Sequence, residues 1–284
     1  MQEASIAVLV VVMMFAIGLR THPSEFVEVG RRPSALLTVV FVNVVVVPAL
    51  VLTLTTVLGL APEITVGLLI CAAAPGGPTG PLFAAEARGH LASAVIAMVS
   101  LSMLSVVTAP AVLALSLGVG ATLETDAILA LVGPMMRTLG GFQLLPLLVG
   151  MALRRVRPRL ADRVAMPASR VANVLLLAVI VGLLVTKGRV LAEVGLVAVG
   201  LAAALVPTCM ALGLAIPGPG AQRRSFAMVT GVRNISLALL LGAAYFPAPL
   251  TDATILTFGL FCMLLPFAIA RLVGRRAAAP NPAS

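Results

Sequence analysis

Few side chains in this sequence could do chemistry within an apolar environment, and Arg233 is the most informative of them. Arg233 lies in a long apolar run, and none of the ten acidic residues lies at the middle of such a run to neutralise it. A charge in the middle of a membrane-spanning helix costs about 2.5–3.5 kcal/mol on insertion scales, so it usually faces the bundle interior or a cavity. Two interpretations stay open. The guanidinium could donate to exposed backbone carbonyls, or it could offer a fixed charge to a carboxylate or sulfonate.

Two amides and three hydroxyls accompany this arginine as candidate binding residues. Asn43 and Asn234 lie in apolar runs and need hydrogen-bond partners when buried. They either satisfy backbone groups or line an ion or substrate site. Thr79, Thr230 and Ser236 flank interrupted stretches, where local backbone bonding is the simpler alternative to ligand contact.

Residues 71–89, CAAAPGGPTGPLFAAEARG, contain the strongest interruption in the chain. Three prolines and three glycines fall within residues 75–81, among them Gly76 and Gly77, and a helix cannot continue through such a segment. In a membrane, interrupted backbone is tolerated only where it is buried in protein or lines a wet cavity. Broken helices of this kind form the binding sites of secondary transporters.

Composition defines the fold class that must position these residues. The chain has 284 residues, of which 61% are apolar and 10% are charged, against roughly 25% charged in soluble domains. Its apolar runs are unbroken rather than alternating, so we expect an all-α integral membrane protein and not a barrel. The three cysteines lie in apolar runs and are expected to be small core residues.

Nine membrane-spanning helices are predicted in one transporter domain, residues 1–276, followed by a disordered tail, residues 277–284. The broken helices are placed at 63–88 and 223–245. The nine runs are 4–19, 33–57, 63–87, 90–117, 127–153, 169–185, 194–216, 226–245 and 251–273. A cluster of arginines between residues 154 and 163 is read as a loop.

The basic residues predict the orientation. Connections after the odd-numbered runs, together with the C-terminal tail, hold nearly all the loop arginines, whereas the other side holds only Lys187 and Arg189. By the positive-inside rule, the N-terminus is outside and the C-terminus is cytoplasmic, in a plasma (inner) membrane. This segregation also argues against a nucleic-acid partner for a chain with a net charge of +9.

Internal repetition predicts two inverted halves. FAIGLRTHPSEFVEVG in the first run and VIVGLLVTKGRVLAEVG in the sixth both end in Glu-Val-Gly. Five runs separate them, so the copies face opposite ways and the third run corresponds to the eighth. Interrupted segments at matching places in inverted repeats are typical of alternating-access transporters. The predicted architecture is a ten-helix transporter fold that lacks its first helix.

These stretches resemble the bile acid:sodium symporter family. APGGPTGPLFAAEARGHLASAV is similar to the family's first broken helix, TGVRNISLALLLGAAYF to its second, and residues 15–30 to an early family segment. The resemblance implies a core domain and a panel domain, with the two broken helices crossing near the bilayer midplane and organic anions passing beside the crossing.

The sequence departs from the family pattern at the sodium site. The resemblance implies a Ser-Asn pair where this chain has Gly80 and Pro81, and a glutamate where it has Val229. The family's glutamine positions fall on Arg233 and Asn43. Two further polar positions fall on alanine and methionine, at 94 and 98. Sodium could bind, but most of its side-chain ligands are missing.

The predicted function is therefore secondary transport of small organic anions, by default with sodium. The main alternative is a sodium-independent uniporter or exchanger in which Arg233 replaces the cation. A metalloid-anion exporter resting on Cys71 and a passive channel are weaker alternatives. No enzyme is expected, because the runs contain no nucleophile and base, and no metal-ligand cluster or cofactor motif. Arg137 and Gln143 are weak additional candidates for the site.

Overall fold

The computed structural model describes residues 2–22, 33–119 and 125–277, and these residues form helices and short connections without any strand. The predicted all-α fold is confirmed. Most of the polar connection after the first helix and the predicted tail from residue 278 lie outside the described residues.

The described residues of the first half of the chain form seven helical elements. They are α1 (Gln2–Arg20), α3 (Pro33–Phe41), the π-helical turn η1 (Val42–Val46), α4 (Val47–Val57), α5 (Pro62–Ala73), α6 (Gly80–Glu86) and α7 (Leu91–Val119).

In the second half, the residues that the structure describes form nine further elements, of which two are short turns. They are α8 (Thr125–Leu139), the π-helical turn η2 (Gly140–Leu144), α9 (Leu145–Val156), α10 (Pro158–Leu191), the 3-10 turn η3 (Ala192–Val194), α11 (Leu196–Ala215), α12 (Gly220–Gly231), α13 (Ile235–Tyr245) and α14 (Pro249–Arg276).

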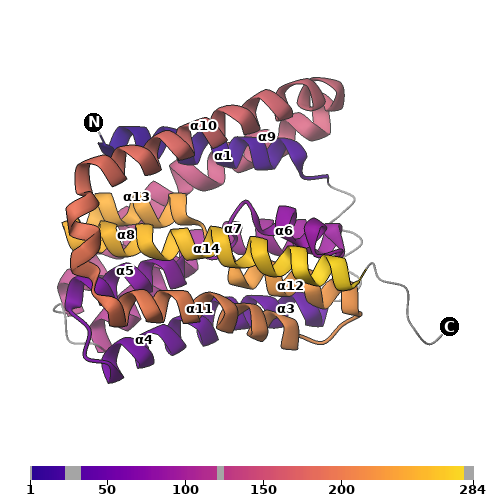
Figure 1. The fold of residues 1–284 in the computed structure, drawn as a ribbon. Helices are drawn as coiled ribbons and strands as arrows, with labels where there is room; N and C mark the ends of the chain where they lie inside the picture. Colours follow the sequence, from indigo (N-terminus) through magenta and orange to yellow (C-terminus); the bar gives the residue numbers. More distant parts are fainter. Residues whose placement is uncertain (1, 23–32, 120–124, 278–284) are drawn as a thin grey trace, which may run out of the picture.

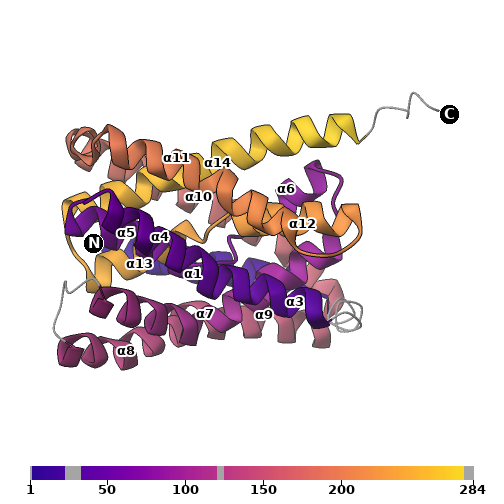
Figure 2. The ribbon, with the colours of Figure 1, turned by 90° about the horizontal axis from the view of Figure 1, so that it is seen from below.

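The long helices run side by side along one direction (Figure 1). α1 packs against α9 and α10 in one layer, and α11 packs against α12 on the opposite side of the molecule (Figures 1 and 2). The α1–α9 contact is close because Gly18 and Gly150 face each other's helix. A Cβ at Gly18 would lie 2.2 Å from the Leu147 oxygen, and one at Gly150 would lie 2.5 Å from the Phe15 oxygen. Small residues of this kind let membrane helices approach closely.

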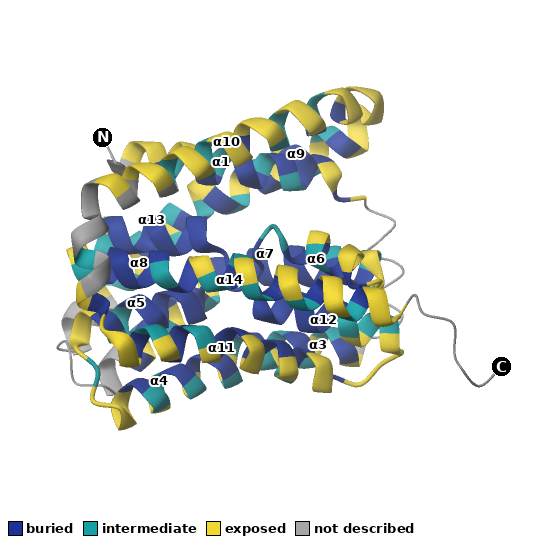
Figure 3. Ribbon diagram, in the orientation of Figure 1, coloured by how far each residue is buried: buried dark blue, intermediate teal, exposed yellow. Residues whose placement is uncertain are grey.

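Burial is concentrated in the interrupted helices. α5, α12 and α13 are dark along most of their length in Figure 3, whereas the outer helices carry many exposed apolar side chains. Among the described residues, six helices are long and apolar enough to cross a membrane, and 4–20 and 62–73 form shorter apolar helices. Membrane-spanning helices are thus present, while the count of nine stays a prediction.

The prediction that residues 154–163 form a loop is wrong, because all but Arg157 of them lie in helices. α9 continues to Val156 and α10 begins at Pro158, where proline suits the first helical turn. Arg154 is buried; its guanidinium donates to the Leu19 carbonyl and pairs with Asp162. The positive charges therefore belong to helix ends, and α10 starts well before the predicted residue 169.

Candidate functional site

The first interruption occupies residues 74–79, between α5 and α6. Pro75 and Pro78 remove backbone donors there, which ends the helix. Gly76 has a φ of +80°. A Cβ at this position would lie 2.7 Å from the Met98 carbonyl oxygen. The turn therefore requires glycine for both its conformation and its space.

The second interruption occupies residues 232–234, between α12 and α13. No proline causes it. The side-chain oxygen of Asn234 accepts a hydrogen bond from the Leu237 amide at 3.1 Å and so caps the start of α13. Thr230 and Gly231 are the last two residues of α12, so Thr230 flanks this interruption.

The two interruptions meet inside the molecule. The backbone N–H of Asn234 donates to the Ala74 carbonyl at 2.8 Å. Gly77 faces the same segment, because a Cβ there would lie only 2.5 Å from the Arg233 carbonyl oxygen. α5 lies against α13, and α6 lies against α12. Each broken helix thus supplies hydrogen-bond partners and packing for the other, which explains how these breaks are accommodated in an apolar interior.

Arg233 lies at this meeting point with 1% of its surface exposed. One terminal nitrogen donates to the Ala72 carbonyl at 3.4 Å and the other lies 3.9 Å from the Cys209 sulfur, while Nε has no partner. No carboxylate in the described parts of the chain forms an ion pair with it. The guanidinium therefore reaches one carbonyl at the end of α5, yet its charge is not neutralised by an acidic side chain.

Asn43 approaches the second broken helix from η1. Its Nδ2 donates to the Val39 carbonyl at 2.8 Å and to the Thr230 hydroxyl at 3.1 Å, whereas its Oδ1 has no partner. A π-helical turn often marks a functional position. The structure thus brings together two predicted residues, Asn43 and Thr230, that lie 187 positions apart in sequence.

A second polar cluster adjoins Gly76, and two of its members were not predicted. The Ser102 hydroxyl donates to the Gly76 carbonyl at 3.1 Å. Gln143, in η2, donates to the Ser102 carbonyl and, at 2.8 Å, to the Ser105 hydroxyl. The only sequence signal for Ser102 and Ser105 is that these polar residues lie three positions apart within a buried apolar helix.

The cysteines also lie around the second interruption. Cys209 touches Arg233, and the Cys262 thiol donates to the Gly231 carbonyl at 3.6 Å. All three thiols are free and buried, as predicted for core residues. Within the described ranges, no group of three His, Cys, Asp or Glu side chains could hold a metal ion.

A cavity of about 520 Å³ opens beside the meeting point. Its polar lining comes from Thr79, Arg233, Ser236 and Thr257. Thr79 and Ser236 contact methionine sulfur atoms, of Met263 at 3.9 Å and Met13 at 3.4 Å. The remaining lining is apolar and includes Leu176 of α10, Val199 of α11 and, from α14, Leu256, Leu260, Phe261 and Met263.

The predicted site residues thus fall into three groups. Gly77, Arg233 and Asn234 lie where the breaks meet, with Thr230 and Asn43 bonded to each other one turn away. Thr79 and Ser236 line the cavity together with Arg233. Gly76 instead faces α7 and the serine cluster.

An all-helical chain with long apolar helices, and with two interrupted helices that meet in its interior, has the architecture of an integral membrane transporter. The model of the Sodium Bile acid symporter family matches residues 7–194, more than half of the chain. The chain therefore belongs to the sodium bile acid symporter family. No individually curated protein matches it. The matched range includes the first interruption and Asn43 but ends before the second interruption.

Proposed function

We propose that this protein is a secondary transporter of small organic anions that works by alternating access at the two meeting broken helices. One observation carries the proposal. Arg233 Nε and Asn234 Nδ2, at consecutive buried positions of the second break, are hydrogen-bond donors without partners. Arg233 also lines the cavity, and a buried positive charge with an unused donor there suits a carboxylate or sulfonate. The proposed architecture has nine spans in inverted repeats, with a core domain and a panel domain.

We further propose that sodium coupling is weak or absent. Gly80 and Val229, where the family resemblance implies oxygen ligands, pack against each other instead. A Cβ on Gly80 would lie 3.3 Å from the Val229 Cα. Arg233 supplies a fixed positive charge that can take the place of the cation. Sodium symport remains the alternative, since the unpartnered Asn43 oxygen and nearby carbonyls could still hold an ion.

The cavity lining suggests what kind of anion fits. Among the described residues that line it, Arg233 is the only charged one, and most of the others are apolar. We therefore expect a substrate with one negative charge and an apolar body rather than a small dianion, because a second charge would lose its hydration without gaining a partner. The proposed location is the plasma membrane, with the C-terminus in the cytoplasm.

Uptake into proteoliposomes tests this function. A labelled bile acid, a keto acid and a sulfonate are offered with and without an inward sodium gradient. We expect uptake that does not depend on sodium, loss of uptake in Arg233→Gln, and partial retention in Arg233→Lys, which keeps the charge. Arg276→Gln, at an exposed helix end, serves as the control and should transport normally.

Two results would contradict parts of the proposal. Wild-type uptake driven by sodium would favour the symport alternative, with Asn43, Asn234 and carbonyls as ion ligands. Normal uptake by a folded Arg233→Gln protein would remove the proposed role of the guanidinium. Thermal unfolding of each variant separates loss of transport from loss of structure.

A further inference from the structure

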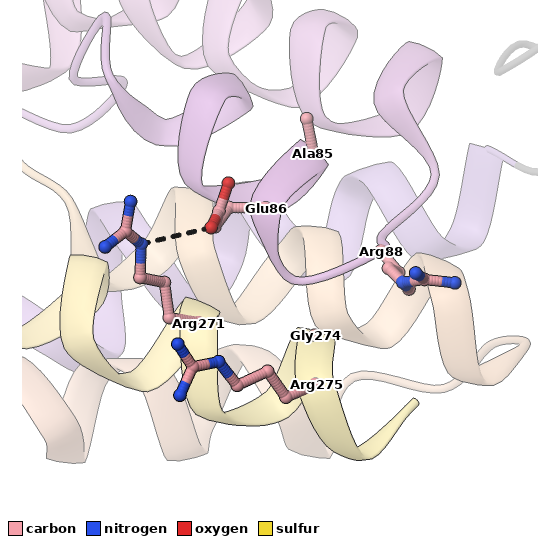
Figure 4. A pocket seen from close by; sticks show the side chains of 6 residues that line it. All are labelled: Ala85, Glu86, Arg88, Arg271, Gly274 and Arg275. Carbon is pink, nitrogen blue, oxygen red and sulfur yellow. Dashed lines mark hydrogen bonds and ion pairs between the residues drawn. The ribbon is translucent and has the colours of Figure 1, made fainter. Parts of the chain in front are cut away.

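A second cavity, of about 560 Å³, lies at the end of the molecule near the C-terminus, between the end of α6 and the last turns of α14. Its charged lining consists of Glu86, Arg88, Arg271 and Arg275, and Ala85 and Gly274 complete it (Figure 4). This cavity is separate from the one beside Arg233, since the two share no lining residue.

The cavity carries an excess of positive charge. Arg271 Nε lies 3.2 Å from a Glu86 carboxylate oxygen, and these side chains are 55% and 46% exposed. Arg275 and Arg88 have no ion pair and no hydrogen bond from their guanidinium groups within the described ranges. In Figure 4, Arg271 and Arg275 extend from α14 on the same side of the helix, whereas the guanidinium of Arg88 points away from them.

The walls of the cavity are held in place by backbone contacts. A Cβ on Gly274 would lie 2.1 Å from the Glu86 carbonyl oxygen, so α14 touches α6 directly. Arg88 has a φ of +52°, which is uncommon for a residue other than glycine. Its carbonyl accepts two hydrogen bonds from the Arg224 guanidinium, at 3.2 and 2.7 Å. These contacts fix the end of α6, so the fold itself sets the position of the cavity walls.

An exposed apolar stripe on α14 leads to this cavity. Leu260, Leu264 and Phe267 are 57%, 55% and 41% exposed. With Arg271 and Arg275 they follow the three- and four-residue spacing of one helix face. The Arg271 guanidinium also lies 4.4 Å from the centre of the Phe267 ring. One helix face thus presents an apolar surface that ends in two arginines.

We propose that this face binds an anionic phospholipid. Its phosphate lies against Arg271 and Arg275, and its acyl chains lie along Leu264 and Phe267. Basic pockets between helices at the membrane surface suit such headgroups, and guanidinium groups bind phosphate through two nitrogens. Arg88, which lines the cavity on the side away from Arg271 and Arg275, adds to its positive electrostatic potential. The acyl chains distinguish this ligand from a free phosphate, which has no apolar part that could contact the stripe.

Native mass spectrometry of the full-length protein in detergent tests the proposal, with added phosphatidylglycerol, phosphatidylcholine or inorganic phosphate. We expect tighter binding of phosphatidylglycerol than of phosphatidylcholine, and about fivefold weaker phosphatidylglycerol binding in Arg275→Gln. The guanidinium of Arg275 has no partner among the described residues, so its replacement should leave the fold intact. Arg276→Gln, one residue further and outside the cavity, is the matched control and should bind as wild type does.

Glu86→Gln adds a test with the opposite sign. Removing this carboxylate frees Arg271 and deletes the one negative charge of the lining, so phosphatidylglycerol binding should become tighter. Equal binding by the Arg275→Gln and Arg276→Gln proteins, or weaker binding by Glu86→Gln, would overturn the proposed site. Competition by millimolar inorganic phosphate as strong as that by lipid would assign the cavity to a free anion instead. None of these measurements depends on transport.

Discussion

Four buried side chains near the interruptions each have one polar atom without a partner: Asn43 Oδ1, Gln143 Oε1, Arg233 Nε and Asn234 Nδ2. Leaving a buried polar atom unpaired costs about 1–3 kcal/mol, so each such atom calls for a physical explanation. The two donors lie at consecutive positions of the second break, next to the proposed anion site. The two acceptors lie in π-helical turns, Asn43 in η1 and Gln143 in η2.

At the residue scale, the bond between Asn43 and Thr230 can be measured by a double-mutant cycle. Asn43→Leu and Thr230→Val should each destabilise the protein, and the pair should show a coupling energy of about 0.6–1.7 kcal/mol, the range for hydrogen bonds between membrane helices. Denaturant unfolding in mixed micelles provides the measurement.

The control for this cycle pairs Asn43→Leu with Thr208→Val. Thr208 is exposed on α11, and its hydroxyl bonds only the Ala204 carbonyl in its own helix. This pair should be additive within about 0.5 kcal/mol. The same coupling in both cycles would mean that Asn43 acts on global packing rather than through Thr230.

At the element scale, local sequence patterns predicted the breaks but not their partners. Proline and glycine chemistry placed the first interruption at 75–81, close to the observed 74–79. The bond from Asn234 to the Ala74 carbonyl could not be predicted in this way, because it depends on tertiary packing between distant segments. Likewise, the arginines after residue 153 resembled a loop because charge alone does not distinguish a loop from helix ends joined by a single residue.

At Gly77, the addition of a single methyl group should push the two broken helices apart. Gly77→Ala places its Cβ 2.5 Å from the Arg233 carbonyl oxygen, and overpacking of this kind typically costs about 1–3 kcal/mol. We expect a lower unfolding temperature and loss of uptake. The measurement is thermal unfolding combined with proteoliposome transport.

Gly200→Ala is the matched control, because nothing lies within 4 Å of a Cβ at this exposed position of α11. Alanine should stabilise the helix there by about 0.5–1 kcal/mol and leave transport unchanged. If Gly77→Ala behaved in the same way, the two interruptions would not need to touch for function.

On the scale of the whole molecule, the arginine-bearing helix ends gather at one end. The last turns of α1, α9 and α14 and the first turn of α12 lie together at the right of Figure 1. Their basic residues include Arg20, Arg154, Arg155, Arg223, Arg224, Arg275 and Arg276. This arrangement is the one expected if that end faces the cytoplasm. Residue counts along the chain predicted the segregation, whereas the cavity between α6 and the last turns of α14 at this end could be found only from the structure.

Accessibility to a membrane-impermeant maleimide tests this orientation in intact cells. The three native cysteines are buried and should react slowly. Glu193→Cys, exposed in η3 at the opposite end, should be labelled from outside, whereas Arg276→Cys should be labelled only after permeabilisation. The reverse pattern would invert the proposed topology, and labelling of both sites in intact cells would contradict the predicted odd number of spans between them.

The mutual bonding of the two breaks has a consequence for how the protein is made. The carbonyl of Ala72 accepts its hydrogen bond from the guanidinium of Arg233, which lies 161 residues later in the chain. At about 5–20 residues per second, a ribosome needs about 8–32 s to synthesise that interval. During this time, α5 and α6 would leave the insertion machinery without the partners that satisfy their ends. We therefore expect the nascent chain to be sensitive to quality-control proteases until α12 and α13 are made. Premature termination before Gly220 should yield a product that is degraded rather than one that persists as a half-transporter.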